Sequence, residues 1–484
     1  MPEILNSNGE SAGNADSQGF ESLTAMSGDF NEASAREAVQ AAKQKVETAA
    51  DKTFDEISEL ISESDITVYE RLNPTNAKAA KEEFLQNPEM TRPNYEYGNL
   101  RASEISKNFR YLQQAESKLD SVELTDSRHR LLDYLIDSNR RKNNFLAANL
   151  AYNLATNPES KQLMAEQHRE ANEALYGKAD EGTFYALLKE QIARIDYDGL
   201  SDDNKKVYNE LLEDIGPIPE TTGDRFIPQP ETVERFSELV NDFYGGFLEH
   251  IPEGKESFSS EDMVDIINEI LDEEMQDSNY RARIDPNVSN ASAEHKKGDR
   301  RIVFPEGKTY TLSRAKALIV HELGTHVLRA TTYADDPIDA FSTETGMPDT
   351  EEFEEGVAKA VEQAINGKFD PFDSGIDHYI NIGLATFKNK NFREVYNIQS
   401  KLKQLTGGDV DTVFVRVQRC FRGTGELPNN KDLIYYNGAN RVWQYIENHI
   451  DDPELFDTLF LTGKTDYLNP EHERFSYEAR TKGI

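Results

Sequence analysis

The stretch Ala315–Leu328, AKALIVHELGTHVL, joins an apolar run to three side chains that can bind a metal ion or a proton. Its first half is apolar enough to favour burial, and His321, Glu322 and His326 then follow within six residues. Buried imidazole and carboxylate groups need partners, because an unpaired polar group in the interior costs free energy. A metal ion is one partner that would satisfy both histidines. The alternative is an ordinary core helix whose histidines bond to neighbouring groups.

The two histidines are five positions apart, whereas the H-E-x-x-H signature of zinc peptidases places them four apart. In a regular α-helix this spacing separates the side chains by roughly 140° around the axis, so they could not share an ion. A locally widened turn of the π type would bring them to one face, and such turns gather at functional sites. Gly324 lies between the histidines and is a poor helix former, so we expect the helix to deform there.

A third ligand is expected in the acidic segment Thr350–Glu362, TEEFEEGVAKAVE, which is predicted to be a helix. Zinc sites that catalyse hydrolysis usually keep three protein ligands and one open position. Glu355, directly before Gly356, is the preferred third ligand, and Glu354 is the alternative. The dipole of a helix also favours carboxylates in its first turn, so the acidic segment alone does not establish a ligand.

The segments HELGTHVLR (residues 321–329) and EEGVA (residues 354–358) resemble the H-E-x-x-x-H zinc metallopeptidases. That family includes the microtubule-associated tyrosine carboxypeptidase, and its bacterial relatives carry a Q-E-G-L-A motif. The resemblance extends from residue 279 to the C-terminus. Glu354 and Val357 depart from the bacterial motif, since they stand in place of Gln and Leu.

The resemblance implies that His321, His326 and Glu355 bind Zn²⁺ and that Glu322 is the catalytic base. A base that directly follows a ligand can reach the metal's water without binding the metal itself. The implied reaction is removal of a C-terminal aromatic residue, such as tyrosine, from a peptide or protein. Two alternatives are a zinc endopeptidase and a non-catalytic binding protein that a metal stabilises.

A carboxypeptidase also needs a cation for the terminal carboxylate of its substrate. Arginine suits this role because its planar guanidinium pairs with a carboxylate through two parallel hydrogen bonds. In order of preference, the candidates are Arg422, Arg419, Arg416 and Arg441. Tyr435 and Tyr436 are candidates for steadying a developing oxyanion.

The composition restricts the partners of the protein. The 484 residues include 53 Lys and Arg against 89 Asp and Glu, so the net charge is −36. An acidic surface repels phosphate groups, which argues against nucleic acid and anionic membranes as partners. No run reaches the roughly 18 apolar residues of a membrane span, and the N-terminus lacks the pattern of a signal peptide. We therefore expect a cytoplasmic protein that acts on a peptide or protein C-terminus.

The periodicity of apolar residues predicts a mostly helical α+β protein, with a zincin-like core that contains a small antiparallel sheet and the metal-binding helix. Three regions are predicted: a disordered tail at residues 1–34, a helical N-terminal region at 35–275 and a zinc metallopeptidase core at 276–484. Residues 413–417 fit either a strand or a buried helix, because a short apolar run does not distinguish the two.

Overall fold

The computed structural model describes residues 51–220, 225–286, 288, 290–296, 299–332, 347–372 and 375–482. Within these residues helices dominate and five short strands complete the fold, which confirms the predicted mostly helical α+β class. The tail predicted at residues 1–34 lies outside the described residues, and the predicted boundaries of the other two regions stay predictions. None of the described helices is both long and apolar enough to cross a lipid bilayer.

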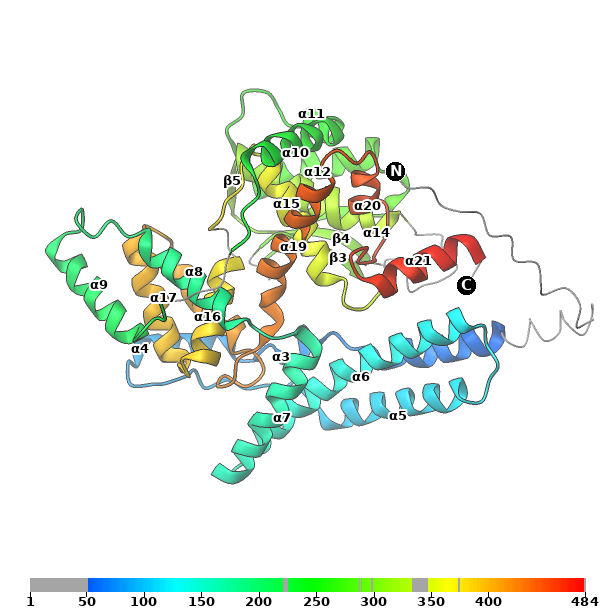
Figure 1. Cartoon of the computed structure of the whole chain (residues 1–484), viewed down its shortest axis with the longest axis horizontal. Coiled ribbons are helices and arrows are strands. Elements are labelled where there is room, and N and C mark those ends of the chain that lie inside the picture. Colours follow the sequence, from blue (N-terminus) through cyan, green and yellow to red (C-terminus); the bar gives the residue numbers. More distant parts are fainter. Residues whose placement is uncertain are drawn as a thin grey trace, which may run out of the picture.

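The first half of the chain is helical. Residues 51–64 form a helix, and seven labelled helices follow: α3 (Val68–Leu72), α4 (Ala77–Gln86), α5 (Ala102–Leu119), α6 (Asp126–Leu154), α7 (Pro158–Tyr176), α8 (Glu181–Ala193) and α9 (Asp202–Ile215). Thr125 directly precedes helix α6, and its side chain accepts the N–H of Arg128 and so caps the first turn. Helices α5, α6 and α7 pack together along the lower side of the molecule (Figure 1).

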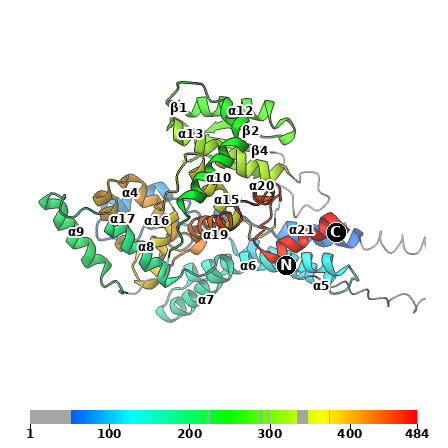
Figure 2. The same cartoon turned by 45° about the horizontal axis from the view of Figure 1, so that its top comes forward.

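The second half adds the strands and the remaining helices. The helices are α10 (Pro230–Phe243), α11 (Gly245–Glu249), α12 (Ser260–Glu273), α13 (Leu312–Leu318), the π-helix η2 (Ile319–Val327), α14 (Leu328–Thr331), α15 (Glu351–Ala364), α16 (Gly375–Phe387), α17 (Phe392–Thr406), α18 (Val413–Cys420), α19 (Leu433–His449), α20 (Leu455–Phe460) and α21 (Pro470–Lys482), with short 3₁₀ turns η1 (Gln276–Ser278), η4 (Val410–Thr412) and η5 (Asn430–Asp432). Residues 413–417 thus belong to a helix, α18. Helices α15 and α19 lie centrally, between α10–α12 on one side and α5–α7 on the other (Figures 1 and 2).

The strands form two small sheets: β1 (Ser257–Ser259) with β5 (Thr309–Thr311), and β2 (Arg281–Asp285) and β3 (Ser292–Lys296) on either side of β4 (Asp299–Pro305). Two antiparallel pairs are present, β1–β5 and β3–β4, whereas β2 and β4 are parallel, so the larger sheet is mixed. The predicted antiparallel arrangement is wrong for the two runs that suggested it, residues 280–285 and 301–304, because these correspond to β2 and β4. The sequence of β4 explains its central place: residues 302–305 are buried in succession, and such a strand needs cover on both faces. The polar strand β3 is left at the edge.

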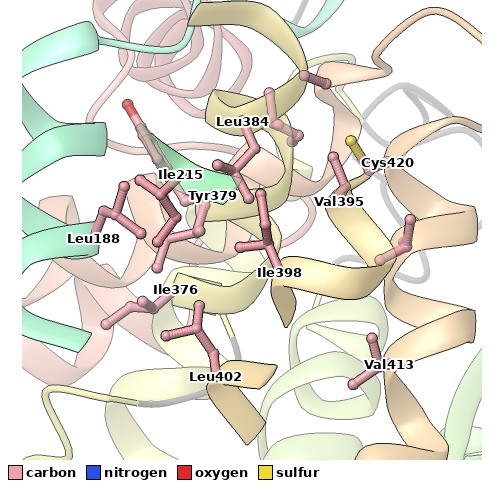
Figure 3. Packing of buried hydrophobic residues seen from close by; sticks show 14 of the residues in the cluster. Leu188, Ile215, Ile376, Tyr379, Leu384, Val395, Ile398, Leu402, Val413 and Cys420 are labelled. Carbon is pink, nitrogen blue, oxygen red and sulfur yellow. The ribbon is translucent and has the colours of Figure 1, made fainter. Parts of the chain in front are cut away.

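One hydrophobic cluster joins the two halves of the chain. Leu188 of α8 and Ile215 of α9 pack with buried side chains of α16, α17 and α18. Figure 3 shows Leu188 and Ile215 close to Ile376, with Ile398 and Leu402 completing the group. A fully buried Leu or Ile contributes about 1.5–3 kcal/mol, so helices α8 and α9 are part of the same folded unit as the C-terminal helices.

The helix that carries the two histidines lies between two other clusters. Ile319 and Leu323 pack toward α12 and the strands, whereas Val320 packs toward α10, α15 and α19. All three side chains are fully buried. His321 and His326 are only partly buried. The helix is therefore held on its apolar sides, and its histidines face the side that remains.

Helices α15 and α19 cross at two glycines. A Cβ atom on Gly356 would lie 2.3 Å from the carbonyl oxygen of Gly438, and a Cβ atom on Gly438 would lie 2.0 Å from the carbonyl oxygen of Glu352. Both distances are far shorter than van der Waals contact, so a side chain at either position would push the helices apart. The crossing sets the position of Glu354 and Glu355 relative to α19.

We expect Gly438→Ala to lower the free energy of unfolding by about 2 kcal/mol or more, because the added methyl group meets backbone that cannot yield. Urea denaturation measures the change. Gly245→Ala is the control, since a Cβ atom at Gly245 meets nothing within 4 Å. Equal unfolding midpoints for the two variants would refute the close crossing.

His168 of α7 is buried against Phe145, and burial lowers its pKa to about 4. Between its ordinary pKa of 6.5 and this value, the unfolded chain binds a proton that the folded chain excludes. Stability therefore falls as the pH falls through this window, by roughly 3 kcal/mol for this residue. We expect His168→Gln to flatten the pH dependence of the free energy of unfolding between pH 6.5 and 4, measured by urea denaturation at several pH values. An unchanged slope would show that His168 is not the source.

Candidate metal centre

The segment Ile319–Val327 is a π-helix within the continuous helix that runs from α13 to α14. Its wider turns bring His321 and His326 to one face, with ring centroids 5.1 Å apart. The hydroxyl of Thr325 donates to the carbonyl of Val320, five residues earlier, at 2.9 Å. The widened helix predicted from the histidine spacing is confirmed, and it spans nine residues rather than a single turn.

Gly324 permits a close contact that stabilises this helix. A Cβ atom at Gly324 would lie 2.5 Å from Cε1 of Tyr244, so no other residue leaves room for that ring. The hydroxyl of Tyr244, from the end of α10, donates to the carbonyl oxygen of Gly324 at 2.9 Å. Tyr244 is fully buried, so its hydrogen bond satisfies a backbone group that water does not reach. Gly324 therefore matters for the approach of Tyr244 as well as for the deformation.

Three side chains offer one ligand atom each within 4.8 Å of one another: His321, His326 and Glu355. Nε2 of His321 lies 3.9 Å from Oε2 of Glu355. A tetrahedral ion with bonds of about 2.1 Å separates its ligands by roughly 3.4 Å, so a small shift would let the three meet one ion. Among the described residues, this is the one cluster of three with such geometry.

Two glutamates of α15 hold the other nitrogen of each imidazole. Nδ1 of His321 lies 3.1 Å from Oε2 of Glu362, and Nδ1 of His326 lies 2.7 Å from Oε1 of Glu354. These bonds orient the rings and leave both Nε2 atoms for the site, as in many metal centres. Glu354 also forms an ion pair with Lys464. Glu354, the alternative third ligand, thus holds a histidine, while Glu355 faces the cluster.

The two glutamates that hold the imidazoles are kept charged by their surroundings. Burial opposes ionisation, but Lys464 holds the pKa of Glu354 well below its ordinary value, and Lys359 similarly lowers that of Glu362. Burial also opposes a charge on His321, yet its hydrogen bond with Glu362 raises the pKa of the imidazole. The site therefore attracts positive charge, which suits a cation.

Glu322 lies beside the cluster and is fixed by the edge strand. It is 5 % exposed, and its Oε2 accepts the backbone N–H of Ala293, on β3, at 2.8 Å. Its Oε1 lies 4.0 Å from Nε2 of His321. One oxygen is therefore anchored and the other is directed to the site, which fits a base that does not ligate the metal.

Two of the four candidate arginines are already paired with carboxylates. Arg416 forms an ion pair with Asp377, which also pairs with Lys403. Arg441 lies 2.6 Å from a carboxylate oxygen of Asp466. Both guanidiniums are therefore already engaged by carboxylates of the protein.

Of the other two arginines, only Arg419 pairs with a carboxylate of the described residues. Arg419 donates to both oxygens of Asp432, at 2.6 and 2.8 Å, and its Nη2 lies 3.1 Å from the hydroxyl of Tyr435. Arg422 is 6 % exposed, and its guanidinium lies 4.1 Å from the ring centre of Tyr69. Within the described ranges, the Arg422 side chain forms no ion pair and no hydrogen bond. This cluster therefore carries one positive charge in excess.

Sequence reasoning missed the residues that hold the ligands. Glu362 was readable in principle, because it follows Glu355 by seven positions, or two helical turns, and so lies on the same face of α15. Lys464 and Tyr244 lie far from the motif in the sequence and carried no signal. The contact of Ala293 with Glu322 is made by the backbone N–H, so the type of residue at position 293 could not predict it.

The family model described as microtubule-associated tyrosine carboxypeptidase matches residues 232–472. Over these residues the chain belongs to this family. Among curated proteins, no sequence matches the chain. The tyrosine carboxypeptidase model covers every residue of the candidate metal centre and all four arginines, and membership supports a carboxypeptidase-type hydrolase in general. The match begins in α10, whose Tyr244 packs on the π-helix.

We expect Glu362→Gln to weaken zinc binding roughly 10- to 100-fold, because the amide replaces the carboxylate that holds His321. Competition with a chromophoric zinc chelator measures the affinity. Glu352→Gln is the matched control, since Glu352 lies on the same helix and pairs with Arg441 instead. Equal affinities of the two variants would contradict the assigned role of Glu362.

Proposed function

We propose that the protein is a zinc-dependent carboxypeptidase that removes a C-terminal aromatic residue from peptides or proteins. One observation carries the proposal: two imidazoles whose Nδ1 atoms are held by carboxylates direct their Nε2 atoms toward Glu355, beside an anchored glutamate. The family match supports the same reaction, since the matching family is described as a tyrosine carboxypeptidase.

The residues fit zinc better than a harder cation. Two imidazole nitrogens and one carboxylate oxygen are ligands that zinc accepts, whereas magnesium and calcium prefer oxygen alone. His321, His326 and Glu355 would hold the ion, and three ligands leave a position open for water and substrate. When bound, zinc would supply Lewis acidity toward the scissile carbonyl and its attacking water.

Glu322 performs the proton transfers in this proposal. Its Oε1 takes a proton from the attacking water and passes it to the leaving amine, while the N–H of Ala293 holds Oε2 in place. Because β3 is an edge strand of its sheet, its outer backbone groups can pair with an extended peptide next to this base. Such pairing would align the scissile bond.

The spare positive charge of the Arg419–Arg422 cluster is proposed to bind the terminal carboxylate. Tyr435 links this cluster to the ligands: its hydroxyl contacts Arg419, and burial together with the charge of Glu355 raises its pKa. A substrate carboxylate would supply the second anion that the two guanidiniums lack. Binding of a terminal carboxylate distinguishes a carboxypeptidase from an endopeptidase, because an endopeptidase cleaves within the chain and does not bind that group.

We predict about one zinc per chain in the wild type, near zero in His326→Ala, and retained zinc in Glu322→Gln. Glu322→Gln should lose activity by roughly 10²–10⁴-fold, because it removes the general base but no ligand. Elemental analysis measures the metal. Mass spectrometry measures release of tyrosine from a peptide with a free C-terminus.

The same peptide with an amidated C-terminus is the control. Cleavage of the free form alone supports a carboxypeptidase, and internal cleavage of both forms would instead establish an endopeptidase. If zinc-loaded wild type cleaves neither form of the peptide and no member of a diverse peptide library, the remaining interpretation is a metal-stabilised binding protein. Equally low metal in wild type and His326→Ala would remove the zinc proposal altogether.

A further inference from the structure

The loop that carries Arg422 is held by helices outside the region that the family model matches. Asn153 of α6 donates to the carbonyl oxygen of Gly423 at 2.8 Å. Asn172 of α7 donates to the carbonyl oxygen of Pro428 at 3.1 Å and accepts the N–H of Asn430 at 3.0 Å. Backbone groups on both sides of the loop are therefore bonded to side chains from the N-terminal region.

The loop also packs on these helices without a gap. A Cβ atom at Gly423 would lie 2.2 Å from Oδ1 of Asn149, on α6, and 3.2 Å from Leu72, on α3. The φ angle of Gly423 is +97°, which a residue with a side chain rarely adopts. Glycine thus serves both the backbone conformation and the close contact.

Ion pairs add to this attachment. Glu426 of the loop lies 2.7 Å from Arg92 and 2.9 Å from Lys161, which come from different parts of the N-terminal region. The hydroxyl of Tyr152 also bonds to Glu426. A loop with this many partners has little freedom to change the position of Arg422.

Aromatic rings from the same region surround the guanidinium. Tyr69, on α3, covers it at 4.1 Å, a distance typical of a cation–π contact. Burial raises the pKa of Tyr97 and of Tyr176, and in both phenols the positive charge of Arg422 opposes this effect. Arg422 therefore lies against Tyr69 and near Tyr97 and Tyr176, and all three aromatic residues belong to the first half of the chain.

We propose that the N-terminal helices complete the substrate site, and that Tyr69 is a positioning residue that holds Arg422 ready for a peptide's terminal carboxylate. An arginine side chain has many rotamers, and a ring stacked on the guanidinium reduces the freedom that binding would otherwise remove. The inference rests on the proposed function, since the ligand of Arg422 is taken to be that carboxylate.

Tyr69 can be changed without disturbing the fold. Its side chain is 45 % exposed, whereas its neighbours Val68 and Leu72 are buried and anchor α3 against Phe145 and Leu146. Tyr197 is a matched control, because it is 41 % exposed and also has a cation, Lys205, over its ring, at 5.6 Å.

The test measures binding rather than turnover. Zinc-loaded Glu322→Gln protein serves as the reference, and fluorescence anisotropy follows a fluorescein-labelled peptide that ends in tyrosine, with a free or an amidated C-terminus. Adding Tyr69→Ala should raise the Kd of the free form about five- to tenfold, the range expected for loss of a partly buried cation–π contact. Tyr69→Phe should retain tight binding because it keeps the ring, and Tyr197→Ala should match the reference.

The outcomes separate this inference from the proposed function. If Tyr69→Ala binds the free peptide as tightly as the reference does, or weakens the free and amidated forms equally, the inference is overturned. If the reference binds both forms equally, Arg422 does not hold the carboxylate, and the inference fails as well. Absence of cleavage by the wild type would overturn the enzymatic proposal, while the binding difference would still decide the role of Tyr69.

Discussion

The hydrogen bond between each imidazole Nδ1 and a carboxylate of α15 is the constraint on which the site depends. Glu354 and Glu362 fix the orientation of His326 and His321, so that both Nε2 atoms point to the side where Glu355 lies. These bonds require α15 to lie close to the π-helix and to keep one face toward it. The glycine crossing of α15 and α19 and the contact of Tyr244 with Gly324 provide that closeness.

Burying several charged side chains around the π-helix is unfavourable in free energy unless each charge has a partner. Burying a carboxylate is unfavourable unless it is paired, and the glutamates of the site are paired with Lys464, Lys359 and the two imidazoles. Such a network stabilises little by itself, because desolvation consumes most of the Coulomb energy. Its value lies in geometry, since removing one partner leaves a buried charge and releases the ring that the partner held.

Helices from the two halves of the chain pack against each other. Helices α8 and α9 share a hydrophobic cluster with α16, α17 and α18, and α10 packs on α15 and α19. The loop of Arg422 lies on α3, α6 and α7. The residues of the candidate metal centre therefore lie within the region that the family model matches, whereas the groups that hold the loop of Arg422, Tyr69 among them, come from the first half of the chain. At this junction Asp432 pairs with Arg419 and not with Arg422, so among the described residues one guanidinium charge is left that a carboxylate ligand would balance.

The sequence by itself determined the local features. The five-residue spacing of the two histidines, with a glycine between them, implied a widened helix, because spacing along one helix is a local property of the chain. The acidic segment that follows in the sequence pointed to Glu355 as the third ligand. Only the tertiary structure decided that Glu354 holds His326, that Glu362 holds His321, and that Asp432 serves Arg419 while Arg422 is left without an ion pair among the described residues. It also placed β4 between β2 and β3. These are contacts between segments distant in the chain, and periodicity carries no information about which distant side chains meet.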